Sequence, residues 1–397
     1  MRATSSRLVP DIPRKDTLMK TPRFTARGAT QAVVLACALA FGPPLLAAKG
    51  DPGNSGDYSV TNLVSDVPGA AANQDSSLVN GWGVVAGPTT PMWVSDNGSG
   101  KSTVYDGTGA LRLTVAIPGV MGTGQGKPTG IVFNLGASPT SNDFLVAGAG
   151  TAARFIWSTE DGGIAAWAGG PSATIRFATS DGAVYKGLAM AGDGSAHFRI
   201  YAADFHNGKV DVIDSNFAKT SVAGGFVDPN LPATFHPFNI MNIQGNLYVA
   251  YALCCEAGSD DEVAGAGLGF VDVFDANGNL IKRVASRGKL NAPWGMALAP
   301  AGFGRFSNHL LVGNFGDGAI NAYDPDDFHF AGQLRGTNHK PLVIDGLWGM
   351  AFGNGFQQQP ATTLFFAAGP NDEANGLYGK IEALPGGNDH SDDDSQD

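Results

Sequence analysis

A short module that recurs along the chain constrains the fold more than any other feature of this sequence. Each copy opens with a small cluster ending in glycine and continues as a short apolar strand. The clearest copies contain Trp-Gly, at residues 81–85, 293–297 and 347–351, and looser copies lie at 128–131, 185–188 and 236–240. Copies about 50 residues apart are typical of β-propeller blades, which share one core.

The composition favours many short strands joined by tight turns. Glycine supplies 56 of the 397 residues, about twice the usual share of roughly 7%, and glycine readily adopts the positive φ angles that tight turns need. In the first module we expect strands at 83–86, 92–95, 103–105 and 111–117. The sequence therefore predicts an all-β fold, a six-bladed β-propeller of four-stranded antiparallel blades over residues 58–384.

The last blade lacks a strand of its own. It begins at Trp348 and reaches only its third strand near residue 384, whereas residues 58–64 have strand character and precede the first blade. We expect this N-terminal strand to complete the last blade, because such a closure removes the free sheet edges of an open ring.

The first 48 residues have the layout of a signal peptide. Residues 1–31 are basic, residues 32–41 are apolar and residues 46–48 are small. The apolar part is shorter than the ~20 residues of a membrane span. We predict cleavage near Ala48, a start at Met19 rather than Met1, and an extracytoplasmic, secreted or periplasmic protein. A disordered N-terminus and a lipoprotein signal at Cys37 are the alternatives.

Charge limits the partners of the protein. The signal segment holds seven Lys or Arg and two Asp or Glu, so the rest is more acidic than the net charge of −11 of the whole chain. An acidic protein is a poor partner for nucleic acid or an anionic membrane. Residues 49–57 are predicted to be a linker and residues 385–397 a disordered acidic tail. A monomer without a disulfide framework is expected, since Cys254 and Cys255 are adjacent and adjacent cysteines seldom pair.

Polar residues recur where second strands end. Asp96, Asp204 and Asn314 each precede another aspartate by ten residues and are followed by a glycine-rich turn. Capping of these turns is the simple interpretation. With Asn239, they also offer oxygen atoms from different blades, which suits Ca²⁺ or another divalent cation at the mouth of a central channel.

The same face of the propeller is expected to carry further ligand-binding residues. The tryptophans of the Trp-Gly motifs either pack between blades or form a platform for a sugar or a peptide, and two histidines and an asparagine lie close to the motifs in the sequence. The candidate ligand-binding residues are Trp82, Asn97, His206, His236, Trp294 and Trp348.

Two levels of family resemblance follow from these motifs. The recurring pattern of apolar residues, aspartate and glycine resembles the NHL class of propeller repeat. The strings at 62–66, 78–83 and 93–98 are similar to an uncharacterised family of exported bacterial proteins, some with a PEP-CTERM sorting tail. This resemblance covers residues 58–384 and implies a propeller and export, but it brings no catalytic residues. The acidic tail does not match the sorting signal.

Two functional hypotheses remain. The first is a binding or interaction scaffold for a protein or glycan ligand on the motif face, which needs only the propeller and its loops. The second is a cation-dependent hydrolase or lyase at the central channel, by fold analogy with gluconolactonase-like propellers that hold a central cation. We favour the binding scaffold, because the sequence shows only part of the ligand set and base that an enzyme needs.

Overall fold

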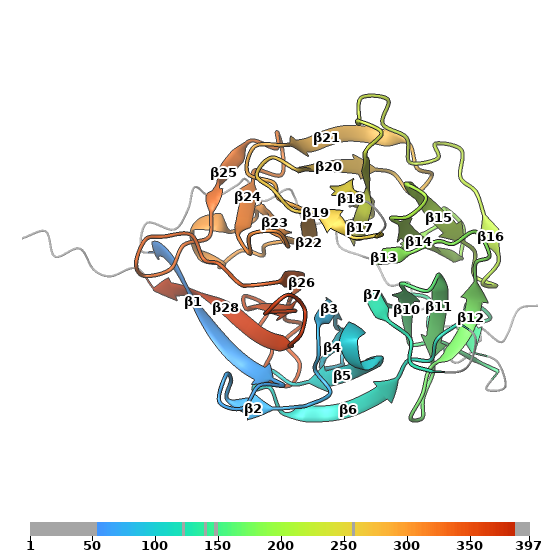
Figure 1. The fold of residues 1–397 in the computed structure, drawn as a ribbon, viewed down its shortest axis with the longest axis horizontal. Helices are drawn as coiled ribbons and strands as arrows, with labels where there is room; N and C mark the ends of the chain where they lie inside the picture. The colour runs from blue at the N-terminus through green and yellow to red at the C-terminus, as the bar shows by residue number, and fades with distance from the viewer. Residues whose placement is uncertain (1–53, 121–123, 139–140, 147–149, 256–258, 386–397) are drawn as a thin grey trace, which may run out of the picture. The chain divides into compact units, whose positions relative to one another are not determined.

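The computed structural model describes residues 54–385 except for 121–123, 139–140, 147–149 and 256–258. The predicted signal peptide at 1–48 and the acidic tail beyond Pro385 lie outside the described residues. Between them, six antiparallel sheets are arranged around a centre as the blades of a β-propeller (Figure 1). The predicted all-β, six-bladed fold is confirmed.

The first three blades follow one another along the chain, and in each the first strand lies nearest the centre of the ring (Figure 1). Their strands are β3 (Gly81–Val85), β4 (Met92–Asp96), β5 (Lys101–Tyr105) and β6 (Leu111–Ala116); β7 (Pro128–Phe133), β10 (Phe155–Thr159), β11 (Gly163–Trp167) and β12 (Thr174–Ala178); and β13 (Tyr185–Gly192), β14 (Phe198–Asp204), β15 (Lys209–Ile213) and β16 (Lys219–Thr220).

The other three blades repeat this order. Their strands are β17 (Phe235–Ile243), β18 (Asn246–Cys254), β20 (Gly269–Phe274) and β21 (Leu280–Ser286); β22 (Pro293–Leu298), β23 (Leu310–Asn314), β24 (Ile320–Tyr323) and β25 (Phe330–Gln333); and β26 (Leu347–Phe352), β27 (Leu364–Ala368) and β28 (Leu377–Pro385). Short accessory elements are β2 (Asn73–Gln74), β8 (Leu145–Val146), β9 (Thr151–Ala152), β19 (Glu262–Val263), η1 (Asn97–Ser99) and η2 (Gly304–Phe306).

Strand β1 (Asn54–Ser65) closes the sixth blade. It runs antiparallel to β28, with Tyr58 opposite Ala383 and Ser65 opposite Leu377, so the predicted closure is confirmed. The strand begins at Asn54, and the last part of the segment expected to be a linker at 49–57 therefore belongs to the sheet. Tyr58 anchors the strand because its buried hydroxyl donates to the carbonyl oxygen of Phe303 at 3.0 Å and accepts from the amide of Phe306 at 3.1 Å.

The glycine of the recurring module is required where the innermost strands of neighbouring blades touch. A Cβ atom at Gly83 would collide with the carbonyl oxygen of Thr129 in β7, and one at Gly349 would collide with that of Trp82 in β3. The equivalent glycines at the other blade junctions are Gly130, Gly187 and Gly295. Only a residue without a side chain permits this approach, so the repeat in the sequence reflects the packing of the ring.

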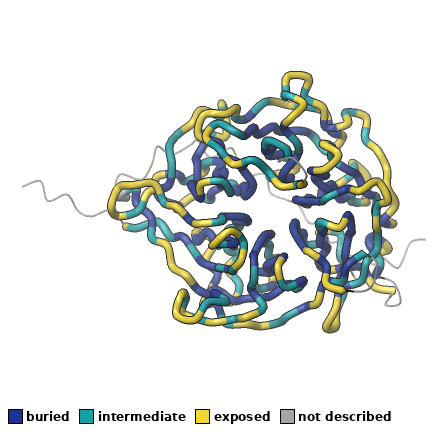
Figure 2. Tube along the Cα trace, in the orientation of Figure 1, coloured by how far each residue is buried: buried dark blue, intermediate teal, exposed yellow. Residues whose placement is uncertain are grey.

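The hydrophobic core is divided among the spaces between adjacent blades. One cluster joins Trp93 of β4 to Phe155, Trp157 and Trp167 of the second blade, all buried. Figure 2 shows buried residues concentrated along the strands and exposed residues along the loops and the outer edge. Burial of each large side chain contributes about 1.5–3 kcal/mol, so the blades stabilise one another. Within the described residues, no helix has the length and apolar character needed to cross a membrane.

Candidate functional site

An aromatic plug fills the central channel at the end where the innermost strands begin. The indole rings of Trp82 and Trp348 stack with centroids 3.5 Å apart, and Trp294 meets them edge-on at 5.9 and 5.6 Å. Phe238 lies 5.6 Å from Trp348. These four side chains come from β3, β26, β22 and β17, immediately before the glycine position of the module, and all are buried. The rings of these tryptophans, which were expected either to pack between blades or to form a ligand platform, are therefore buried against one another.

Lysine takes the tryptophan position in the third blade. The side chain of Lys186 in β13 is only 3% exposed, and its Nζ lies 5.2 Å from the centre of the Trp82 ring. The same Nζ lies 3.0 Å from Oε1 of Glu160 and 3.6 Å from Oδ1 of Asp261. Burial alone would lower the pKa of Lys186, but the nearby carboxylates of Glu160 and Glu262 outweigh burial and raise the pKa. The lysine is therefore a buried cation.

Glu160 is the direct partner of this lysine. It follows the last residue of β10, and its Oε2 accepts a hydrogen bond of 2.9 Å from Nδ2 of Asn97, which holds the equivalent place after β4. Burial tends to raise the pKa of Glu160, but Lys186 and Asn97 stabilise the carboxylate, so the pKa falls below its usual value. Lys127, 4.0 Å away, is mostly exposed. Asn97, expected on this face, thus supports the buried ion pair.

Two further carboxyl groups face the same lysine. Burial raises the pKa of Glu262 to about 7, even though Lys186 opposes the shift. Burial also raises the pKa of Glu373, against Lys186 and a hydrogen bond from Asn80. Four carboxyl groups therefore interact electrostatically with a single buried lysine. We call this set the polar mouth, and its members are Asn97, Glu160, Lys186, Asp261, Glu262 and Glu373.

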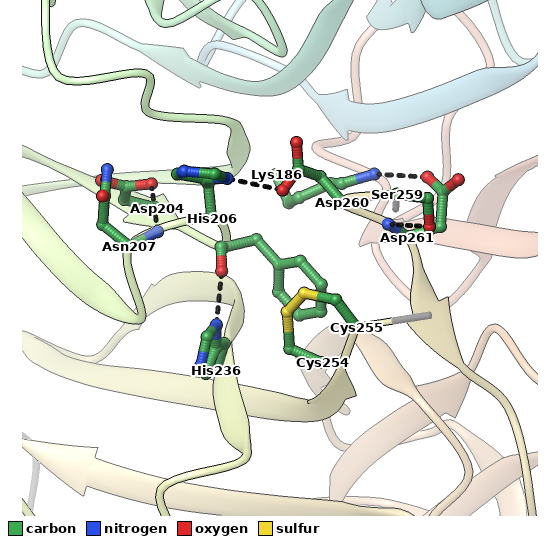
Figure 3. The surroundings of a disulfide bond; sticks show 11 residues. Lys186, Asp204, His206, Asn207, His236, Cys254, Cys255, Ser259, Asp260 and Asp261 are labelled. Atoms are coloured by element: carbon green, nitrogen blue, oxygen red, sulfur yellow. Dashed lines mark hydrogen bonds and ion pairs between the residues drawn. A yellow bond between two sulfur atoms is a disulfide. The ribbon is translucent and has the colours of Figure 1, made fainter. Parts of the chain in front are cut away.

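The two histidines expected on this face lie apart: His206 is beside Asp260, which precedes the mouth residue Asp261, and His236 is near Cys254 and Cys255 (Figure 3). Nδ1 of His206 is 2.6 Å from Oδ1 of Asp260, and this hydrogen bond raises the pKa of His206. Both side chains are nearly half exposed. Nδ1 of His236 lies 2.6 Å from the carbonyl oxygen of Phe205. His206 therefore belongs to the rim, and His236 is fixed by the backbone.

The polar residues that end the second strands are engaged by neighbouring loops and strands. The buried carboxylate of Asp96 accepts from the Thr103 hydroxyl at 3.2 Å, that of Asp204 accepts from Nδ2 of Asn207 at 2.8 Å, and Nδ2 of Asn314 donates to the carbonyl oxygen of Lys289 at 2.8 Å. Successive side chains of a strand point to opposite faces. The residues that follow these positions, such as Asn97, Phe205 and Phe315, are the ones that contact the channel groups.

Asn239 is not equivalent to the other three expected cation ligands. It lies within the innermost strand β17, at the position where other blades carry glycine, rather than at the end of a second strand. Its Nδ2 donates to the carbonyl oxygen of Trp294 at 2.7 Å, and its Oδ1 accepts from the amide of Ile240 at 2.8 Å. The blade-four copy of the module thus carries a side chain at the glycine position, and this side chain bonds across the blade junction.

Among the described residues, one group of acidic side chains is close enough to hold a cation, and it lies within blade three. Asp204 joins Asp181 and Asp211 there. Lysine ammonium groups already neutralise it, because Nζ of Lys209 is 2.7 Å from Asp181 and Nζ of Lys219 is 2.8 Å from Asp211. The cluster is a set of ion pairs on the blade.

The adjacent cysteines correct another expectation. Cys254 and Cys255, at the end of β18, are joined by a disulfide. The bond links neighbours in the chain and ties no two elements together, so the sheets depend on burial and hydrogen bonds as predicted. The pair packs against the aromatic plug, and both sulfur atoms and a ring nitrogen of His236 lie within 4.8 Å of one another.

Sequence reasoning missed the central members of the polar mouth. In the sequence, Lys186 stands out only as an exception to the repeat, because Lys-Gly occupies the position at which three other blades have Trp-Gly. Glu160 could have been found by aligning the ends of the second strands. Glu262 and Glu373 carry no repeat signal, because they reach the mouth from the segment between β18 and β20 and from the turn between β27 and β28.

The fold and this mouth define the class of protein: a six-bladed β-propeller with an aromatic plug in its channel and buried charges above it. No family model matches the chain. The chain belongs to a family that includes two uncharacterized proteins of Acanthamoeba polyphaga mimivirus. It is 31% identical to R648 over 82% of this chain and 80% of that protein, and 30% identical to L690 over 82% and 85%. These relatives are viral, so the expected bacterial family rests on the sequence motifs alone.

Solved structures resemble the chain only distantly. A streptogramin B lyase is 11% identical with a TM-score of 0.48, covering 82% of this chain and 97% of that one. A putative gluconolactonase is 12% identical with a TM-score of 0.41, covering 65% and 89%. At this level of similarity, neither structure says anything about the activity of this protein.

Proposed function

We propose that the protein is a binding protein whose polar mouth receives a cationic group of a protein partner. The observation that carries the proposal is the excess of carboxyl groups over the one buried cation, Lys186, which Glu160 already neutralises. The pKa values of the partly buried Glu262 and Glu373 are raised because desolvation disfavours their charged forms more than Lys186 favours them. A lysine or arginine side chain of a partner would supply further positive charge.

The aromatic plug favours a protein over a glycan as the ligand. A sugar platform needs an exposed aromatic face, and Trp82, Trp294 and Trp348 are at most 3% exposed. Among the described residues, these aromatic side chains pack together behind the mouth. A shallow acidic surface ringed by loops suits basic side chains presented by another protein.

Binding of a lysine- and arginine-rich peptide tests this proposal by calorimetry. Glu262→Gln with Glu373→Gln should weaken binding at least about tenfold, as expected when charge pairs are lost. Affinity should also fall from pH 8 to pH 6, because Glu262 then takes up a proton. Asp326→Asn, at an exposed acidic residue on an outer turn, is the matched control. Equal binding by the double variant and the parent would contradict the proposal.

We propose an enzymatic role only as a second candidate, a hydrolase or lyase. Its support is the pKa of about 7 of Glu262, which is suitable for a general acid or base, and the neighbouring His206–Asp260 pair. The four oxygen ligands expected for Ca²⁺ give this candidate no support. A screen of lactones and esters, with and without divalent cations, tests it; activity that survives Glu262→Gln unchanged would exclude Glu262 from the chemistry.

We further propose that the protein is exported as a monomer after cleavage near Ala48. The support is the basic, apolar and small-residue layout of residues 1–48. N-terminal sequencing of the natively produced protein tests the cleavage, and light scattering tests the monomer. Residues 19–31 on the mature protein would contradict export by this signal.

A further inference from the structure

The disulfide beside the aromatic plug brings together donors that the proposed binding role does not use. The two sulfur atoms of Cys254 and Cys255 and a ring nitrogen of His236 form one of the two groups among the described residues that are close enough to ligate one ion. All three residues are partly exposed, and Figure 3 shows them in their surroundings. Thiolate and imidazole are the donors that Zn²⁺ and similar thiophilic cations prefer.

The hydrogen bond of His236 prepares its ring for this role. A carbonyl oxygen can only accept, so the contact of 2.6 Å between Nδ1 and the Phe205 oxygen places the proton on Nδ1. The neutral ring then keeps a free lone pair on Nε2. A backbone carbonyl bonded to the other ring nitrogen is how proteins orient histidine ligands of metals.

We infer that Cys254, Cys255 and His236 form a redox-gated site for a thiophilic cation such as Zn²⁺. In the disulfide state the sulfurs are bonded to each other and cannot act as thiolates. A dithiol reductant transfers two electrons and two protons to the disulfide and itself becomes a cyclic disulfide. Binding of Zn²⁺ then displaces two thiol protons, and three protein ligands leave a fourth position for water.

The distances are compatible with such a site. Bonds of about 2.3 Å to sulfur and about 2.0 Å to nitrogen separate tetrahedral ligands by about 3.5 Å, and both sulfur atoms and a ring nitrogen of His236 already lie within 4.8 Å of one another. Breaking the sulfur–sulfur bond frees both cysteine side chains to rotate. Rotation of these side chains and of the His236 ring, whose Nε2 packs toward Gly208, would complete the set.

The test uses the full chain carrying Cys37→Ser, so that Cys254 and Cys255 are the only thiols. Protein reduced with dithiothreitol and desalted without oxygen is titrated with Zn²⁺ against a chromogenic chelator. We expect one Zn²⁺ per chain after reduction and none in the disulfide form. His236→Gln should weaken binding by at least about tenfold, and Cys254→Ser with Cys255→Ser should abolish it.

The control is His309→Gln, because His309 also bonds a backbone carbonyl, that of Ser307, but belongs to no such group of donors. It should bind Zn²⁺ like the parent, and circular dichroism should show every variant folded. Three results would overturn the inference: no Zn²⁺ bound after reduction, equal binding in the disulfide form, or unchanged affinity in a folded His236→Gln variant.

Discussion

At the scale of single residues, one substitution in the repeat creates the candidate site. Lys186 stands where other blades place tryptophan, and it brings a charge into an aromatic channel. The buried cation is tolerated because Glu160 pairs with it at 3.0 Å and Asn97 supports Glu160. A buried pair is a poor source of stability but costly to break.

We therefore expect Lys186→Met to lower the free energy of unfolding by about 3–5 kcal/mol, because Glu160 would remain buried without its partner. Adding Glu160→Gln should recover part of that loss. Lys127→Met is the control, since Lys127 lies 4.0 Å from the same carboxylate but is 67% exposed, and it should change stability by less than about 0.5 kcal/mol. Urea unfolding measures all three; equal effects of the two lysine variants would contradict this view.

Glu262 makes stability depend on pH. Its folded-state pKa of about 7 lies above the ordinary value of 4.5, so the folded protein holds this proton more tightly than the unfolded chain does. The resulting stabilisation is complete below pH 4.5 and is lost as the pH rises through 7. We expect Glu262→Gln to stabilise the protein by about 1–2 kcal/mol at pH 8 relative to the parent, with little difference at pH 4.5. Thermal melts of the parent and of Glu262→Gln at both pH values show whether the difference in their stability grows with pH.

Asp204 provides a third prediction at this scale. Its carboxylate accepts from the side chain and the backbone amide of Asn207 and from the backbone amide of Val184. Asp204→Ala should cost about 1–3 kcal/mol, because buried donors lose their acceptor. The loss should be the same with and without EDTA, since it arises from hydrogen bonds. A loss that appears only in chelator-free buffer would instead support the cation site expected from the sequence.

The sequence could place only part of the site. It located the face through the motifs, and it named Asn97, which belongs to the polar mouth, together with His206 and His236. The cation site expected at Asp96, Asp204 and Asn314 stays a prediction, and the structure adds the local hydrogen bonds that these side chains make. The pKa values of Glu262 and Glu373 depend on burial by segments far away in the chain, which periodicity does not reveal.

At the scale of elements, the sixth blade was predictable because a count of strands leaves one missing. Residues 58–64 were predicted to form a strand that belongs to no other blade, and β1 is the missing outer strand of the sixth blade. The extension back to Asn54 could not be foreseen, since residues 54–57 are polar and rich in turn formers. Pairing with β28 imposes strand conformation where local propensity does not.

Removing β1 should open two sheet edges and strip the Tyr58 hydroxyl from its partners. A chain that begins at residue 67 should lose most of its cooperative thermal transition or melt far below the parent. A chain that begins at residue 54 is the matched control and should melt like the parent, because it keeps the whole strand. Calorimetry compares the two; a normal transition in the shorter chain would show that the closure is dispensable.

At the scale of the whole propeller, the plug separates two unlike ends of the channel. Above it lies the polar mouth, and beyond it, at the far ends of the innermost strands, lies an apolar pocket of about 350 Å³ lined by residues such as Val84, Ile131, Leu188 and Met190. The number of blades followed from the repeat, since each module is one unit of the ring. The aromatic plug could not be predicted from the repeat. The arrangement of the whole ring decides which side of a Trp-Gly motif faces the channel.

Trp348→Ala should remove the centre of the plug and lower stability by about 3–5 kcal/mol, the usual cost of deleting a large buried aromatic side chain. Trp348 contacts four aromatic side chains, those of Trp82, Trp294, Phe238 and Phe315. Because these rings hold one another in place, they can fill little of the cavity that the substitution leaves. Phe330→Ala, at a residue that is 45% exposed on an outer strand, is the control and should cost far less. Similar unfolding midpoints for the two variants would contradict a structural role for the plug.

The pairing of β1 with β28 also has a meaning for protein synthesis. Strand β1 leaves the ribosome before β28, and at about 5–20 residues per second it waits roughly 15–60 s for that strand. A chain that stops early cannot close the ring, however well its first five blades have formed. The last hydrogen bonds to form thus require β28, and chains terminated before that strand keep an open sheet edge.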